Sequence, residues 1–385
     1  MFSVDFEASL PSLIFYYLLI LVVCIAVEAY QYLYFEKVEK NPVADRLIRL
    51  LVILPFVLAV GLRSSNVGYD TPEYIASFQS ISNYSLGQVV SLRNTGFNIL
   101  QLVFSSVFGN SYTLFFIFIS GTTAYLLLSG LIRFSNRVHR ISLSFGIFVF
   151  MMLFALNAMD QMRQMLAMSI WFYGISYIFE KRLLAYVAVV VLASVIHSSL
   201  LIAFPMYFFS WDLDRRRHVA ILGLSVLSLI FASFSSSIFS FASFIFRNAD
   251  YYSVYFSKES MLQTVEGTGS GLGFILNLAT IALPLLFSTP SMNNKIYSFF
   301  LLSFLYAIPL RMLGYESFFL SRLYLIPAMT SVLSYPVVVS ELRIADKRSA
   351  VLFQLVCFLF LGFLFGYFTL TSHGIVPYSS VLTVR

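Results

Sequence analysis

Residues 350–371 read AVLFQLVCFLFLGFLFGYFTLT, a run of 22 residues without one Asp, Glu, Lys or Arg. A helix that crosses the hydrocarbon of a bilayer needs about 20 such residues. The rest of the chain has the same character: 59% of its 385 residues are hydrophobic and 11% are charged. Soluble domains carry about 25% charged residues. We therefore predict an integral membrane protein without a separate soluble domain.

The length of the apolar runs predicts helices rather than a barrel. Barrel strands alternate in polarity over about ten residues, whereas these runs are continuous over about 15 to 22 residues. Hydrocarbon offers no partner to backbone N–H and C=O groups, so such runs satisfy them within a helix. The predicted spans are 10–34, 47–62, 112–132, 141–158, 164–179, 219–245, 272–288, 296–312, 318–340 and 350–371.

Two stretches depart from this simple pattern. Residues 97–108 are too short to cross, which predicts a re-entrant or interfacial helix. Residues 183–211 have basic residues at both ends, which one helix would place on opposite faces; a split near His197 into a short hairpin avoids this. The result is an all-α bundle of about 12 transmembrane helices in one domain, 1–385, with external loops 63–95 and 246–271.

Lys and Arg residues test this topology, because they are retained on the cytoplasmic side. The predicted cytoplasmic loops hold 16 of the 24 Lys and Arg residues, with both chain ends outside. The net charge of +6 therefore reports topology, and we expect no nucleic-acid partner. The eight external residues are Arg63, Arg93, Arg163, Arg247, Lys258, Arg311, Arg322 and Arg385.

The chain lacks the sequence motifs of several classes of enzyme. There is no HExxH, CxxC, GxSxG or Walker A motif, so we expect neither a metal nor another cofactor. The nearest acidic cluster, Asp212 with Asp214, is interpreted as a solvated cytoplasmic loop. Cys24 and Cys357 lie within apolar runs and are interpreted as small buried hydrophobic residues.

Four of the external arginines adjoin the ends of apolar runs: Arg63, Arg163, Arg311 and Arg322. A charge at such a position is costly unless it is paired or functional. Each could pair with a nearby acid, such as Glu316 near Arg311, or extend to the interface. Together, at one membrane depth, they favour an anion-binding cavity, because a guanidinium keeps its charge and binds phosphate oxygens bidentately.

Asp70 and His197 are the titratable candidates. Asp70 follows Gly68 in a turn-like stretch, and a carboxylate beside a cationic cavity is suited to take a proton from a sugar hydroxyl. An ion pair with Arg63 explains Asp70 equally well. His197 lies at the apex of the predicted hairpin, where imidazole could bind a phosphate or transfer a proton. A hydrogen bond to a helix carbonyl is its alternative.

The external segment 248–273 carries the tyrosines of DYYSVYF and then the glycines of GTGSGLG. Tyr252 and Tyr255 offer flat faces on which sugar rings can stack, and the glycines suggest a mobile gate. An interfacial aromatic belt and a flexible loop account for the same residues.

A set of short motifs resembles the EpsG family of exopolysaccharide and O-antigen polymerases, the Wzy-type enzymes. The resemblance runs from about residue 20 to 340. Family members often carry an acidic residue just before the GF element, where this chain has Asn94 and Thr95, so no catalytic carboxylate is transferred to that position. The motifs are Arg63 with Gly68, Asp70 and Tyr74; Gly96, Phe97 and Asn98; Asn157 with Arg163 and Gln164; Ile196, His197 and Ser198; Tyr252 with Tyr255; and Arg322 with Tyr324.

The resemblance implies a GT-C-like glycosyltransferase of the bacterial inner membrane that joins undecaprenyl-diphosphate-linked oligosaccharide units, its active site facing the periplasm. Its implied partners are this lipid-linked substrate, membrane lipid and a chain-length regulator protein. In this interpretation Asp70 is the base, and Arg163 and His197 are also catalytic. The substrate-binding residues are Arg63, Gln164, Arg311, Arg322, Tyr74, Tyr252, Tyr255 and Tyr324.

Two other classes of function fit the same residues. A flippase for the lipid-linked oligosaccharide would also use arginines, but it needs a midplane cavity reachable from both faces, whereas these arginines lie at outer helix ends. An O-antigen ligase or a membrane acyltransferase would share an outward site. Transfer to lipid A core would indicate a ligase, and acyl transfer would require a His–Asp pair.

Overall fold

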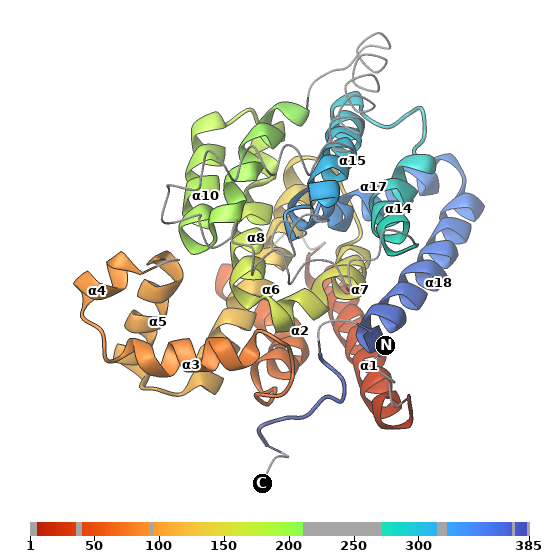
Figure 1. The fold of residues 1–385 in the computed structure, drawn as a ribbon. Helices are drawn as coiled ribbons and strands as arrows, with labels where there is room; N and C mark the ends of the chain where they lie inside the picture. Colours follow the sequence, from red (N-terminus) through yellow and green to blue (C-terminus); the bar gives the residue numbers. More distant parts are fainter. Residues whose placement is uncertain are drawn as a thin grey trace. The chain divides into compact units, whose positions relative to one another are not determined.

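The computed structural model describes residues 6–35, 41–92, 95–210, 272–313, 322–371 and 374–382, and its regular structure is helical (Figure 1). The prediction of an α-helical membrane protein is confirmed, while the count of twelve crossings and the GT-C-like arrangement stay predictions. Six helices in these ranges are long and apolar enough to cross a membrane: Ser9–Leu33, Tyr112–Arg137, Leu143–Asp160, Asn294–Met312, Leu325–Ala345 and Lys347–Thr371.

The chain forms two compact units, which we call unit 1 (Met1–Leu201 with Tyr335–Arg385) and unit 2 (Ile202–Ser334). The helices of unit 1 are α1 (Phe6–Tyr30) with its continuation η1 (Gln31–Phe35), α2 (Pro42–Gly61), α3 (Thr71–Ile81), α4 (Leu86–Ser91), α5 (Thr95–Phe108), α6 (Tyr112–Arg137), α7 (Leu143–Asp160), α8 (Met162–Gly174), α9 (Ser176–Phe179), α10 (Leu183–Ile196), most of α17 (Ser331–Ala345) and α18 (Lys347–Thr371).

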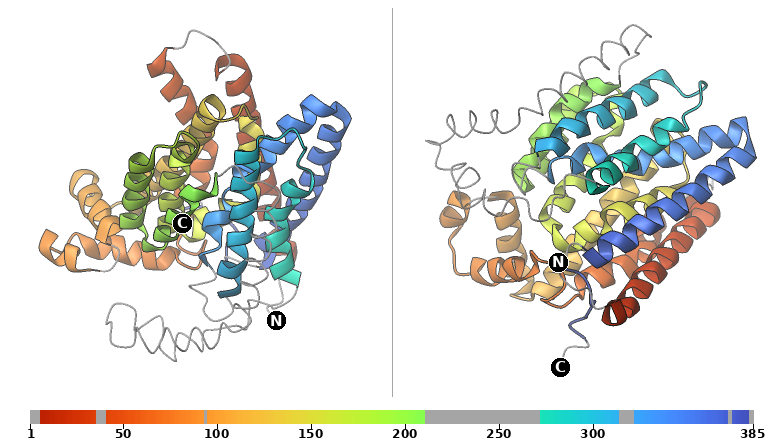
Figure 2. Two further views of the ribbon diagram at one scale, coloured as in Figure 1. Left: turned by 90° about the horizontal axis from the view of Figure 1, so that it is seen from above. Right: turned by 45° about the vertical axis from the view of Figure 1, so that its right-hand side comes forward.

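Two helices organise the packing of unit 1. Helix α6 packs against α2 and α8, and α7 packs against α1 and α18, which run side by side (Figure 2). Nearly every residue of α7 is buried, which explains why its sequence is apolar on all sides rather than on one stripe. The neighbouring helices therefore surround α7 on most sides.

Local capping signals set several helix boundaries. The side-chain oxygen of Asn41 accepts hydrogen bonds from the N–H groups of Val43 and Ala44, at 2.9 and 3.2 Å, and so starts α2. At the end of α10, His197 has an extended backbone with φ −148° and ψ 111°, and the 3-10 helix η2 (Ser198–Phe209) follows. The predicted split near His197 is confirmed.

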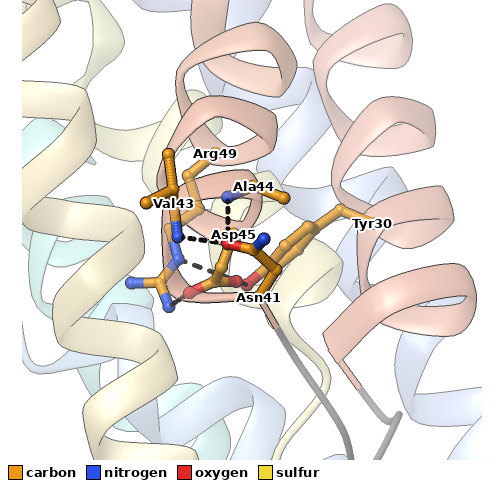
Figure 3. A network of polar contacts seen from close by, with 6 residues as sticks. All are labelled: Tyr30, Asn41, Val43, Ala44, Asp45 and Arg49. Carbon is orange, nitrogen blue, oxygen red and sulfur yellow. Dashed lines mark hydrogen bonds and ion pairs between the residues drawn. The ribbon is translucent and has the colours of Figure 1, made fainter.

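A polar network joins the end of α1 to the start of α2 (Figure 3). Tyr30 donates its hydroxyl hydrogen to Asp45 Oδ1 at 2.7 Å, and Arg49 pairs with the same carboxylate while its Nε donates to the Tyr30 hydroxyl at 3.3 Å. We call this part of the molecule the Asp45 end of unit 1. Helix α2 runs from it to Gly61, two residues before Arg63, and we call the opposite part the Arg63 end.

The segment 63–95, predicted as an external loop, contains α3 and α4, and the predicted short helix at 97–108 is α5. These three helices form a small group beside α6, in which α5 contacts both α3 and α4 (Figure 1). Fourteen residues of helix make α5 too short to cross a bilayer. The predicted span 219–245 and loop 246–271 lie outside the described residues.

Unit 2 contains α14 (Leu272–Leu286), α15 (Asn294–Leu313) and α16 (Leu325–Ala328), and α15 packs against both of the others. Tyr306 of α15 donates its hydroxyl hydrogen to the carbonyl of Ile202 at 3.1 Å. This bond ties the start of unit 2 to its central helix.

Candidate functional site

Arg63 lies two residues beyond α2, and its side chain is completely buried, with 0% exposed. Its Nε donates to Thr71 Oγ1 at 3.3 Å, its Nη1 donates to the Val60 carbonyl, and its guanidinium carbon lies 4.5 Å from the centre of the Phe116 ring. Among the described residues, its Nη2 has no hydrogen-bond partner. A buried guanidinium with one unengaged nitrogen can donate to an anionic ligand.

The carboxylate of Asp160, at the end of α7, partly balances the charge of Arg63. Burial lowers the pKa of the Arg63 guanidinium to about 10, while Tyr74 and Asp160 act in the raising direction. Arg63 therefore keeps its charge near neutral pH. Asp160 is only 3% exposed, and it also accepts a hydrogen bond at 3.0 Å from the backbone N–H of Asp70. One buried carboxylate thus links Arg63 to the start of α3.

The turn before α3 requires a glycine. Gly68 has φ +93°, a conformation that residues with a Cβ rarely adopt, and a Cβ there would lie 2.8 Å from Thr71 Oγ1 and 3.4 Å from Asp160 Cα. Asp70 occupies the N-cap position of α3 and makes no side-chain cap hydrogen bond. The half-buried carboxyl of Asp70 is therefore not engaged in capping the helix.

We expect Gly68→Ala to destabilise the protein by about 1–2 kcal/mol, because alanine is strained in the left-handed region. The fraction of monodisperse protein left after heating, measured by size-exclusion chromatography, checks this. Gly87→Ala in α4 is the control, since a Cβ there meets nothing within 4 Å and alanine favours a helix. Equal heat sensitivity of both variants would show that the Gly68 conformation does not hold the turn.

A break between two helices positions Arg163. Helix α7 ends at Asp160, Gln161 leaves the helical conformation with φ −114° and ψ 49°, and α8 begins at Met162. Arg163 is half-buried in the first turn of α8, its guanidinium carbon 6.0 Å from the centre of the Phe97 ring. Its Nε has no hydrogen-bond partner in the part of the chain that the structure describes. The positive end of the α8 dipole adds to its attraction for an anion.

Both arginines lie over rings of one hydrophobic cluster, which we call the aromatic cluster. Phe97, the ring under Arg163, lies 6.0 Å from Tyr74 and 5.8 Å from Phe115 between ring centres, and Phe116, the ring under Arg63, is buried in the same cluster. A rigid apolar support limits the positions of both guanidiniums. The cluster consists of Tyr74, Phe78, Phe97, Phe104, Phe115, Phe116, Ile119, Met162 and Leu166.

The GF element and His197 are adjacent because of a close helix approach. A Cβ on Gly96 would lie 2.5 Å from the Val195 carbonyl oxygen, so only glycine lets α5 approach the end of α10 this closely. Ile196 packs against the aromatic cluster. The next residue, His197, is half-buried, and its Nδ1 lies 2.7 Å from Ser199 Oγ. This hydrogen bond orients the ring.

The segment 374–382, which we call the C-terminal segment, pairs with the backbone around Arg63. The N–H of Ser64 donates to the Ser379 carbonyl at 2.9 Å, and the N–H of Val381 donates to the Leu62 carbonyl at 2.8 Å. Arg63 and Ser380 thus form an isolated antiparallel bridge. These bonds hold the backbone that carries Arg63.

In unit 2, Arg311 is 7% exposed and its guanidinium carbon lies 5.1 Å from the centre of the Tyr324 ring. Its Nε and Nη1 have no hydrogen-bond partner among the described residues. Arg322 is half-buried just before α16. The structure does not describe Glu316, Tyr252 or Tyr255. That Arg63, Arg163, Arg311 and Arg322 line one anion-binding cavity stays a prediction.

Six predicted site residues belong to unit 1: Tyr74 is part of the aromatic cluster, Arg63 and Arg163 lie over its rings, and the others are Asp70, Gln164 and His197. Sequence reasoning missed the role of Asp160 and of the C-terminal segment. Asp160 had a signal, since it is an acid that ends an apolar run three residues before Arg163. The C-terminal segment had none, because its pairing is through backbone groups.

The fold and these side chains define the class: an α-helical membrane protein with arginines supported by aromatic rings at one end of its helices. A family model described as the EpsG family matches residues 46–380, and the chain belongs to this family. The comparisons with curated proteins and with solved structures gave no match. Membership of the EpsG family suggests a polysaccharide polymerase that acts in a membrane.

Proposed function

We propose that this protein polymerises undecaprenyl-diphosphate-linked oligosaccharide repeat units at the periplasmic face of the bacterial inner membrane. The observation that carries the proposal is the pair Arg63 and Arg163, each with a nitrogen that has no hydrogen-bond partner among the described residues. A lipid diphosphate is the matching ligand, because its oxygens accept charge-assisted hydrogen bonds from such guanidinium nitrogens. Membership of the EpsG family supports the same reaction class.

In the proposed reaction, a hydroxyl oxygen of the incoming unit attacks the anomeric carbon of the growing chain. The bond from that carbon to the diphosphate oxygen breaks, and its electron pair stays on the leaving diphosphate. The hydroxyl proton passes to a carboxylate. Negative charge grows on the diphosphate in the transition state, and positioned guanidiniums stabilise it without reorganising.

Asp70 is the proposed base rather than Asp160. The carboxylate of Asp160 accepts a hydrogen bond from the Asp70 N–H and partly balances the charge of Arg63, so we assign it a structural role. The carboxyl of Asp70 is half-buried and does not cap α3. His197, oriented by Ser199, and Gln164, beside Arg163 in α8, are proposed to position the substrate.

Four further residues are proposed to bind the substrate. Arg311, whose guanidinium lies over Tyr324, and Arg322 would bind phosphate, and Tyr252 and Tyr255 would bind sugar rings. A GT-C-like bundle of about twelve crossings and an associated chain-length regulator belong to this proposal.

The direct test is a reaction of the purified, reconstituted protein with lipid-linked repeat units of one defined length. We expect a ladder of longer lipid-linked chains and release of undecaprenyl diphosphate. Substrate that binds but yields no longer chain would refute the polymerase.

A flippase and a ligase give different products in the same vesicles. A flippase would expose externally added, fluorescently labelled substrate to the vesicle interior without lengthening it. A ligase would transfer one chain to added lipid A core and leave the repeat units unjoined. Arg63 lies just beyond the end of α2, and Arg163 lies in the first turn of α8. Because transporters bind their substrate near the middle of the membrane, arginines at helix ends favour the polymerase over a transporter.

A further inference from the structure

A groove of about 800 Å³ lies between α1, α7, α17 and α18 in unit 1. None of the proposed site residues lines it. It begins near Ser142 at the start of α7, whereas Asp160 and the Arg63 end lie at the other end of that helix. Eighteen residues of helix separate these ends by about 27 Å, and Met152, the lining residue of α7 nearest to Asp160, is still eight residues or about 12 Å from it, so the groove is distinct from the proposed active site.

The wall of the groove changes from polar to apolar along the helices. On α1, Glu28 is at the polar end, and Leu21 and Tyr17 lie deeper. On α7, Ser144 is at the polar end and Met152 lies deeper. Neighbouring helices thus show the same order of polarity, which is the order of a membrane lipid from headgroup to acyl chain.

The length of the groove also fits a lipid. Tyr17 and Glu28 both line it, and eleven residues of α-helix span about 16 Å. The hydrocarbon of one leaflet is about 15 Å deep, half of the bilayer core. In Figure 2, α1 and α18, which form two of its walls, run side by side. A soluble anion would not use the apolar depth of such a groove.

Two arginines and one glutamate are the charged residues of the lining. Arg140 and Arg343 are exposed at the polar end, and Glu28 accepts a hydrogen bond from the Ser144 hydroxyl. The cationic excess matches a phosphate that carries no compensating positive group. We propose that the groove binds one anionic phospholipid, its phosphate at Arg140 and Arg343 and one acyl chain along α1 and α7.

Native mass spectrometry of the full chain in detergent, titrated with phosphatidylglycerol, tests the headgroup site. We expect one tightly held lipid, and an affinity about 30-fold lower in the double variant Arg140→Ala/Arg343→Ala. The matched control, Arg137→Ala/Arg348→Ala, removes two exposed arginines that do not line the groove and is expected to bind like the unaltered protein. Equal affinity of both double variants would overturn the proposal.

Two further arms identify the occupant. Phosphatidylcholine with the same acyl chains should bind more weakly, and inorganic phosphate should not displace the bound phosphatidylglycerol. Equal binding of the two lipids, or displacement by phosphate, would refute an anionic phospholipid. Neither result depends on polymerase activity.

Fluorescence quenching tests the acyl-chain path. Phosphatidylglycerol with brominated acyl chains, added at one molecule per protein in detergent, should quench Leu21→Trp more than Leu18→Trp. Leu21 and Leu18 are similarly exposed, at 54% and 55%, but only Leu21 lines the groove. Equal quenching at both positions would place the chain outside the groove and contradict the proposal.

Discussion

Arg163→Ala is expected to lower the rate of chain growth about 100-fold to 1000-fold while the protein remains folded in the membrane. Arg163 is half-buried at the first turn of α8, and its guanidinium lies over Phe97 with its Nε unengaged by any described residue. Removing one positioned donor from the developing charge of a leaving group has an effect of this size. The measurement is the initial rate of ladder formation from lipid-linked repeat units.

The control for this variant is Arg182→Ala. Arg182 also lies over an aromatic ring, 5.2 Å from the centre of Tyr177, and it pairs with Glu180 at 3.7 Å at the other end of α8 and α9. Its side chain is 60% exposed, so its loss should leave both folding and chain growth unchanged. Polymer of normal length and rate from Arg163→Ala would contradict the role assigned to Arg163.

Arg63→Lys is expected to lower chain growth about 10-fold to 100-fold, which is the effect of losing one charge-assisted hydrogen bond. The three guanidinium nitrogens have separate positions: Nε donates to Thr71, Nη1 donates to Val60, and Nη2 remains for the substrate. A lysine keeps the charge near Asp160 but has one nitrogen and cannot replace this planar arrangement. Initial rates at saturating substrate measure the loss.

Arg49→Lys is the matched control. Arg49 also binds two partners through separate guanidinium nitrogens, Asp45 and Tyr30, but it lies at the Asp45 end of unit 1 (Figure 3). It should weaken that network without changing chain growth. If Arg63→Lys polymerises at the unaltered rate, charge alone is sufficient and the hydrogen bond assigned to Nη2 of Arg63 is excluded. If Arg49→Lys is equally impaired, the loss reflects general destabilisation.

The sequence was informative wherever a feature is local. The break at His197 follows from basic residues at both ends of one apolar run, and the short helix at 97–108 follows from its length. Arg63 and Arg163 stood out because arginine is rare on the external side. Gly68 and Gly96 were recognised as motif residues, but the close contacts that require them involve residues distant in the chain.

By itself the sequence determined that the chain lies in a membrane, that it folds as α-helices, and where most of these helices lie along the chain. The physical reason is that hydrocarbon requires each span to satisfy its backbone within about 20 consecutive residues. Tertiary structure alone decided that Asp160 lies near enough to Arg63 to balance part of its charge, that the C-terminal segment pairs with Leu62 and Ser64, and that a groove opens beside α1. These features depend on how helices remote in sequence pack together, and helix packing uses many weak contacts that leave no local pattern.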